Sequence, residues 1–176
     1  MEAADITKVK TASDPQLSPD GRYVAFVVTS LSQETDAYHS AIWLAETATG
    51  HLRQVTAGDK RDTSPRWSPD SRRLAFLSDR DTKKKTQLFV LPLAGGEARC
   101  VASNKQGVSD PVWSPDGDRL AFRARVGGWE EPADEAERAK SKPARIITTL
   151  KHKMNGEGFT YDRNNAAVLT NCWLNG

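Results

Sequence analysis

Apolar residues in this chain are concentrated in short runs, separated by polar stretches rich in proline, glycine and aspartate. The runs YVAFVV from Tyr23 and LAFL from Leu74 are apolar at consecutive positions, and LAF from Leu120 repeats their centre. Short runs rich in β-formers predict strands, and the lack of alternation predicts a sheet that is covered on both faces. No stretch has the roughly 18 consecutive apolar residues of a membrane-spanning helix.

The same turn sequence precedes each of these runs. It reads S-P-D-G, S-P-D-S and S-P-D-G, and the copies begin 50 and then 46 residues apart. Proline pre-sets φ, aspartate can cap backbone N–H groups and glycine tolerates positive φ, so each copy predicts a tight link between antiparallel strands. Ser71 replaces glycine in the second copy, and we expect that turn to be slightly strained or of another type. The repeat-turn residues are Ser18, Pro19, Asp20, Gly21, Ser68, Pro69, Asp70, Ser71, Ser114, Pro115, Asp116 and Gly117.

The copies match well beyond the turn. Each has a proline two residues before an apolar anchor (Leu17, then tryptophan twice), and each later run contains Ala-Phe. The spacing lies near the period of a β-propeller blade. We expect the core of the repeat to contain Trp67, Trp113, Phe26, Phe76 and Phe122.

Two further strands follow in each of the first two units. The stretches Ala41 to Thr56 and Gln87 to Ala102 read as a β-rich run, a turn with glycine and a second β-rich run, which is the pattern of a hairpin. The sequence therefore predicts an all-β fold of about three four-stranded antiparallel β-propeller blades, forming an incomplete, open propeller.

The third unit departs from this pattern. Residues near 130–142 have a helix-forming composition, a strand is expected at 144–150, and the last residues lack the third and fourth strands of a blade. The predicted organisation is a lead-in at 1–13, blade 1 at 14–60, blade 2 at 61–107, partial blade 3 at 108–163 with the helical insertion, and a divergent tail at 164–176.

Closing a propeller takes at least about four blades. Three repeats leave an exposed blade face and unpaired strand edges, so we expect marginal stability and self-association through the open blade edge. This favours a truncated or frameshifted gene product over an evolved independent module.

Charge and cysteine content exclude several partner classes. The 25 Lys and Arg nearly balance 23 Asp and Glu, giving a net charge of +2, so we expect neither nucleic acid nor membrane as a partner. The N-terminus lacks the basic and apolar regions of a signal peptide, which favours a cytoplasmic protein. Cys100 and Cys172 lie far apart and offer no CxxC metal half-site. No metal and no other cofactor is expected.

The sequence contains no candidate for the catalytic serine or the general base of a hydrolase. A nucleophile elbow has the sequence G-x-S-x-G, which is absent, and the histidines at positions 39, 51 and 152 lie beside turns, loops or lysines. The serines and aspartates of the repeat turns recur with the repeat, so we interpret them as turn residues and expect no catalytic or metal-binding role.

The repeat residues carry a family resemblance. The three P-x-(W/L)-S-P-D-(G/S) units, the start TASDPQLSPDGRYVAFVVT and the segment ARIITTLKHKMNGEGFTYDR resemble the N-terminal propeller of prolyl oligopeptidase family serine peptidases, in the bacterial acylaminoacyl-peptidase and dipeptidyl-peptidase-like branch. The resemblance covers Asp5 to about Arg163. TolB-type propellers share the S-P-D-G unit, whereas the segment from Gly156 to Phe159 favours the peptidases.

This resemblance implies a propeller of about seven blades followed by an α/β-hydrolase domain that is absent from this chain. It also implies proteolysis of peptide substrates by the full-length family, with the propeller restricting access to the active site. In dipeptidyl-peptidase-type relatives an adjacent glutamate pair holds the peptide N-terminus, which points to Glu130 and Glu131 as substrate-binding candidates, although a solvated charged helix explains them as well. This chain alone is predicted to be inactive. The alternative is an independent TolB-like propeller module that binds a protein partner.

Overall fold

The computed structural model describes residues 9–32, 36–80, 85–125, 153–154, 158–159 and 165–170. The strands are β1 (Lys10–Leu17), β2 (Tyr23–Ser32), β3 (Ala37–Glu46), β4 (Leu52–Gln54), β5 (Asp62–Trp67), β6 (Arg73–Ser78), β7 (Gln87–Pro92), β8 (Arg99–Ala102), β9 (Val108–Trp113), β10 (Leu120–Arg125), β11 (Lys153–Met154), β12 (Gly158–Phe159) and β13 (Asn165–Thr170). No helix that could cross a membrane occurs among these residues.

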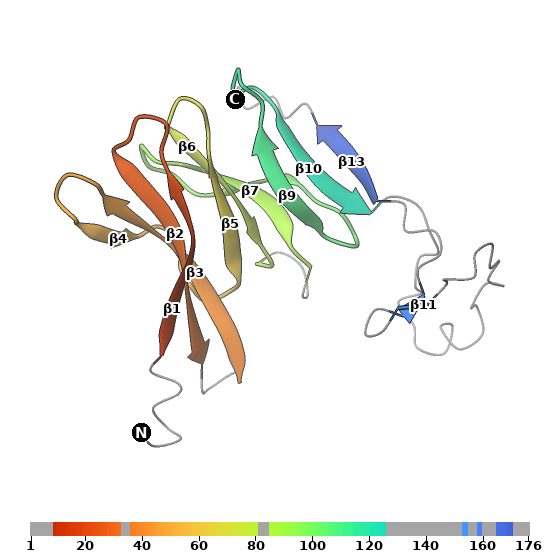
Figure 1. The fold of residues 1–176 in the computed structure, drawn as a ribbon. Helices are drawn as coiled ribbons and strands as arrows, with labels where there is room; N and C mark the ends of the chain where they lie inside the picture. Colours follow the sequence, from red (N-terminus) through yellow and green to blue (C-terminus); the bar gives the residue numbers. More distant parts are fainter. Residues whose placement is uncertain are drawn as a thin grey trace. The chain divides into compact units, whose positions relative to one another are not determined.

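The strands form blade-like sheets (Figure 1). Blade 1 is the four-stranded sheet β1-β2-β3-β4, and blade 2 is β5-β6-β7-β8. Blade 3 has the order β13-β10-β9. Neighbouring strands with described registers are antiparallel. The prediction of an all-β fold built from propeller blades is confirmed.

Blade 3 obtains its third strand from a distant part of the sequence. The tail was expected to lack this strand, but β13 lies beside β10 in the sheet. The chain divides into two compact units, residues 1–124 with 167–176 and residues 125–166, and the second contains the short antiparallel pair of β11 and β12. The expected helical insertion near 130–142 and the strand at 144–150 lie outside the described residues.

Blade 2 explains why its central strand is apolar at successive positions. Leu74 and Phe76 pack in one cluster with blade 1, whereas Ala75 and Leu77 pack in a second cluster with blade 3. Successive side chains of a strand point to opposite faces, so a strand between two neighbours needs apolar residues at every position. The first cluster contains Ala25, Ile42, Leu44, Trp67, Leu74, Phe76, Phe89 and Leu91, and the second contains Ala75, Leu77, Leu88, Val90, Val108, Leu120, Phe122 and Ala124.

The aromatic residues of blade 2 form the centre of the first cluster. Phe76 is 0% exposed and stacks on Phe89 with ring centroids 5.7 Å apart. Full burial of one such side chain contributes about 1.5–3 kcal/mol. The packing of blade 2 on blade 1 therefore depends on this pair.

The corresponding face of blade 1 is less covered. Leu17, at the repeat position of Trp67, is 62% exposed, whereas Trp67 is 9% exposed. Phe26 and Trp43 are only partly buried, although they occupy the positions of Phe76 and Phe89. In blades 2 and 3 the equivalent apolar face is packed against the preceding blade. In blade 1 this face is partly exposed.

This difference predicts unequal costs for one substitution at two equivalent positions. Phe76→Ala should lower the free energy of unfolding by about 3–5 kcal/mol, because it leaves a cavity in a closed cluster. Phe26→Ala should cost less than half as much, since its ring already contacts solvent. Urea unfolding followed by circular dichroism measures both, and equal costs would show that the face of blade 1 is covered in solution.

Candidate functional site

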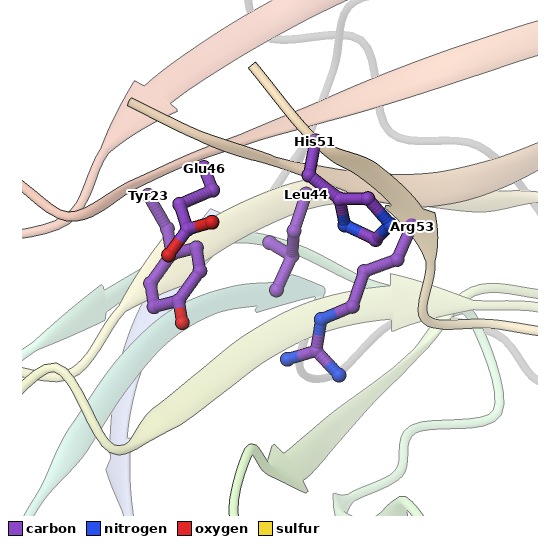
Figure 2. A pocket seen from close by; sticks show the side chains of 5 residues that line it. All are labelled: Tyr23, Leu44, Glu46, His51 and Arg53. Carbon is purple, nitrogen blue, oxygen red and sulfur yellow. The ribbon is translucent and has the colours of Figure 1, made fainter. Parts of the chain in front are cut away.

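A hollow of about 160 Å³ lies on blade 1, lined by Tyr23, Leu44, Glu46, His51 and Arg53 (Figure 2). These residues come from β2, from β3, and from the turn and strand β4 that follow it. Sequence reasoning did not single out any of them as a site, because they are spread over 31 positions and share no motif.

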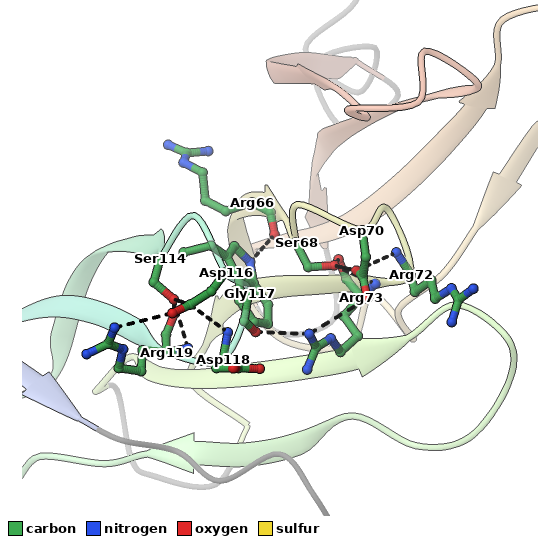
Figure 3. A network of polar contacts seen from close by, with 11 residues as sticks. Arg66, Ser68, Asp70, Arg72, Arg73, Ser114, Asp116, Gly117, Asp118 and Arg119 are labelled. Atoms are coloured by element: carbon green, nitrogen blue, oxygen red, sulfur yellow. Dashed lines mark hydrogen bonds and ion pairs between the residues drawn. The ribbon is translucent and has the colours of Figure 1, made fainter.

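The repeat turns form a second polar arrangement (Figure 3). In blade 2 the backbone N–H of Arg73 donates to Ser68 Oγ at 2.9 Å, and this hydroxyl donates to Asp70 Oδ1 at 2.5 Å. Asp70 Oδ1 also accepts from the backbone N–H of Arg72 at 3.1 Å. The turns of blades 1 and 3 repeat all three bonds, through Ser18 with Asp20 and through Ser114 with Asp116.

The second turn has the same backbone conformation as the other two. Ser71 has φ of 59°, against 72° for Gly21 and 76° for Gly117. Of the two alternatives expected for this turn, strain is confirmed and a different turn type is not found, because the serine takes up the left-handed conformation that disfavours side chains. Ser71 Oγ accepts the backbone N–H of Asp20 at 3.1 Å, which links the turns of blades 1 and 2.

Hydrogen bonds in the turns lower the pKa values of the three aspartates. The Ser114 hydroxyl and then the Asp118 backbone N–H lower the pKa of Asp116 from 3.8 to about 2. The pKa of Asp20 is lowered mainly by the Ser18 hydroxyl. At Asp70 burial opposes the change, but hydrogen bonds from Ser68 and the Arg72 backbone outweigh it, so its pKa is also lowered.

These shifts predict a loss of stability in acid. A carboxylate whose pKa is lowered by folding stabilises the folded state above its unfolded pKa, and this contribution disappears as the pH falls through the folded pKa. Stability should therefore decrease between pH 3.8 and about 2. Asp116→Asn should make this decrease shallower in urea unfolding at several pH values.

Asp118→Asn is the matched control, because the Asp118 side chain makes no hydrogen bond within the described part of the chain. A pH profile that Asp116→Asn leaves unchanged would contradict the role of the turn carboxylate.

Tryptophan side chains join each blade to the one before it. Trp67 Nε1 donates to the backbone oxygen of Gln16 at 2.8 Å, and Trp113 Nε1 donates to that of Arg66 at 3.0 Å. Both acceptors directly precede the anchor position of the preceding blade. A buried indole N–H needs such a partner, so these two bonds fix how successive blades are aligned.

The residue that closes each turn lies on the tryptophan of the next blade. Tyr23 stacks on Trp67 with centroids 6.5 Å apart, and the Arg73 guanidinium lies 5.0 Å from the centre of the Trp113 ring. Arg73 Nη2 also donates to the backbone oxygen of Gly117 at 2.9 Å (Figure 3). We call the indole hydrogen bond and this stacking together the tryptophan contact.

The tryptophan contact predicts a cost for removing one indole N–H. Trp67→Phe should lower the free energy of unfolding by about 1–3 kcal/mol, because the indole N–H and the Gln16 carbonyl are partly buried and the carbonyl loses its partner. Chemical denaturation of the variant measures this change.

Trp43→Phe provides the comparison, since the Trp43 indole makes no hydrogen bond within the described residues and is partly exposed. It should cost less than about 1 kcal/mol. Similar costs for both variants would be inconsistent with the tryptophan contact.

Each blade also has a bulge that sequence reasoning missed. Asp14, Ser64 and Asp110 have φ of 48°, 53° and 52°, and each directly precedes the repeat proline. The pairing register of the first strand shifts at these positions. The only sequence feature that marks these bulges is an aspartate or serine directly before each repeat proline. In blade 1 the bulge residue Asp14 forms an ion pair at 2.9 Å with Arg66 of blade 2.

At the end of β5 and β6 that lies away from the repeat turn, blade 2 has an ion pair that the other two repeats lack. Asp62 is 1% exposed, and both of its carboxylate oxygens accept from Arg80 Nη2 at 3.0 Å. The Arg80 guanidinium also lies 5.1 Å from the Phe76 ring centre and 5.0 Å from that of Phe89. The positive charge of Arg80 thus balances the negative charge of the buried Asp62 carboxylate, and its guanidinium lies over the rings of Phe76 and Phe89.

The remaining predicted residues occupy different places. The turn serines Ser18 and Ser68 are 2% and 0% exposed and bind within their turns. Glu130 and Glu131 lie outside the described residues. In the described ranges, no three His, Cys, Asp or Glu side chains gather where they could hold a metal ion.

Comparison with known proteins places the chain in a family. The model of PD40, the TolB beta propeller domain, matches residues 3–169, and the chain belongs to this family. Over 95 residues it is 46% identical to "Uncharacterized peptidase YuxL" of Bacillus subtilis (strain 168), which covers 54% of this chain and 14% of that protein. The chain therefore spans about one seventh of that peptidase.

Solved structures agree on the fold. The acylaminoacyl peptidase of Pyrococcus horikoshii is 25% identical, with a TM-score of 0.57 over 74% of this chain and 19% of that one. The propeller of the Trilobed protease of Pyrococcus furiosus is 22% identical, with a TM-score of 0.55 over 66% of this chain and 35% of that one. The predicted likeness to acylaminoacyl-peptidase propellers is confirmed.

Proposed function

We propose that these residues form part of the propeller of a prolyl oligopeptidase family serine peptidase, and that the blades restrict the access of peptides to a catalytic site in an α/β-hydrolase domain outside this chain. The observation that carries the proposal is the 46% identity to a peptidase over 95 residues. The fold shared with an acylaminoacyl peptidase supports it.

The unequal blade faces support the presence of further blades. Leu17 is 62% exposed, whereas the equivalent Trp67 and Trp113 of the later blades are buried and partly buried against a preceding blade. Arg119 occupies the position from which Tyr23 and Arg73 stack on the tryptophan of the following blade, and it pairs at 3.2 Å with Asp116. Both ends of the blade series therefore carry the groups that a neighbouring blade would use.

The chain alone is proposed to be inactive and cytoplasmic. It contains no G-x-S-x-G elbow, so hydrolysis requires a serine supplied by the α/β-hydrolase domain. Without neighbouring blades, the apolar face of blade 1 gives a reason for self-association, because contiguous exposed apolar surface promotes it.

A chimaera tests the proposed role. The 95-residue segment of the Bacillus subtilis peptidase that matches this chain is replaced by the corresponding residues of this chain. The chimaera should react with a serine-directed probe and hydrolyse short acyl-peptides in preference to a large unfolded protein such as casein. The 176-residue chain alone should show neither activity.

A variant of the peptidase that lacks the segment is the control, and it should lose the preference for short substrates. A folded chimaera without this preference would contradict the gating role. Inhibitor-sensitive hydrolysis by the isolated chain would contradict its proposed inactivity. The second candidate is a TolB-like module that binds a protein partner, because the TolB propeller model matches residues 3–169.

A further inference from the structure

Strand register brings the residues of the hollow on blade 1 together. Tyr23 of β2 lies opposite Glu46 of β3, and Leu44 of β3 lies opposite Arg53 of β4. The backbone oxygen of His51 accepts the N–H of Glu46 at 2.9 Å, which holds the turn beside them. Because directly opposed residues share a face of the sheet, four side chains from distant positions reach one place.

This place is the outer corner of the face that packs on blade 2. Leu44 is 1% exposed and belongs to the first cluster, and Tyr23 packs against that cluster. The Tyr23 ring stacks on Trp67, and the Arg22 guanidinium lies 5.6 Å from its centre, so two contacts hold the ring in place. The hollow therefore has an apolar base and a rigid aromatic wall.

The polar groups of the hollow have capacity left for a ligand. The Tyr23 hydroxyl, the His51 ring and the Arg53 guanidinium make no hydrogen bond or ion pair within the described part of the chain. Glu46 Oε2 accepts from the Thr49 hydroxyl at 2.6 Å, which orients the carboxylate and leaves its other oxygen available. Figure 2 shows Glu46 beside Tyr23 and the Arg53 guanidinium across the hollow from them.

We propose that this hollow binds a free α-amino acid as a zwitterion. Arg53 and the Tyr23 hydroxyl bind the carboxylate, and Glu46 accepts from the ammonium group. A guanidinium binds a carboxylate through paired hydrogen bonds, whereas the nearby Glu46 disfavours phosphate and other multiply charged anions. A volume of about 160 Å³ admits a small amino acid, since pockets for larger ligands measure roughly 300–1,000 Å³. This site is independent of the proposed peptidase role.

Titration of the isotope-labelled 176-residue chain with glycine, followed by amide NMR shifts, tests the site. Saturable shifts are expected at Tyr23, Glu46, His51 and Arg53. Arg53→Gln should weaken binding at least about tenfold, because a hydrogen-bonded charge is lost. Tyr23→Phe keeps the ring on Trp67 and should weaken binding about two- to tenfold.

The repeat provides a matched control. Arg99 of β8 lies opposite Val90 as Arg53 lies opposite Leu44, so Arg99→Gln removes an equivalent charge from blade 2 and should leave glycine binding unchanged. Well-dispersed spectra of every variant establish that the blades remain folded.

Three further ligands distinguish the chemistry. Acetate and methylammonium should each bind more weakly than glycine, and Glu46→Gln should reduce glycine affinity to that of acetate. Glycylglycine, whose charges lie farther apart, should also bind more weakly. Equal binding of acetate and glycine would overturn the zwitterion assignment, and the absence of saturable shifts with glycine would overturn the site.

Discussion

The alignment of successive blades depends on one hydrogen bond, which an indole N–H of one blade donates to a backbone carbonyl of the blade before it. Trp67 and Trp113 insert between blades, and each donates to a backbone carbonyl of the preceding blade. Leaving such a donor unpaired in a buried place costs about 1–3 kcal/mol, so only one sliding position of the two blades is favourable. The stacking of Tyr23 and Arg73 on these rings then aligns the repeat turns of adjacent blades.

Because every contact of this kind joins neighbours, the blades behave as a one-dimensional series. Blade 2 has a neighbour on each face, and its central strand β6 is buried from Leu74 to Ser78. Blade 1 has no equivalent contact through Leu17, and its aromatic residues remain partly exposed. The burial of a repeat residue is therefore decided by the position of its blade in the series, and only secondarily by the residue itself.

The same distinction explains what the sequence could predict. The turns and the strands after them depend on local residues, so S-P-D-G and the consecutive apolar runs indicated them correctly. Strand β13 could not be predicted, because its partner β10 precedes it by some 40 positions with no repeat motif between them. Strain at Ser71 was expected from the missing glycine, but the hydrogen bond that compensates it was not, because its donor is Asp20 of another blade. The hollow on blade 1 was missed because only register joins its residues.

Repetition also limits where a blade can acquire a specific function. Serine, aspartate and the anchor tryptophan are committed to the turn and to the tryptophan contact, so substitutions there disturb the stacking of blades. The outer strands β4 and β8 have no such structural role. Arg53 and Arg99 occupy equivalent positions on them, yet the first lies opposite Leu44 beside Glu46, and the second lies opposite Val90 beside Pro92. At this corner, therefore, a carboxylate lies near a guanidinium on blade 1 and not on blade 2. Chemistry that differs between blades is accordingly expected at the outer strands, where the fold does not determine the side chains.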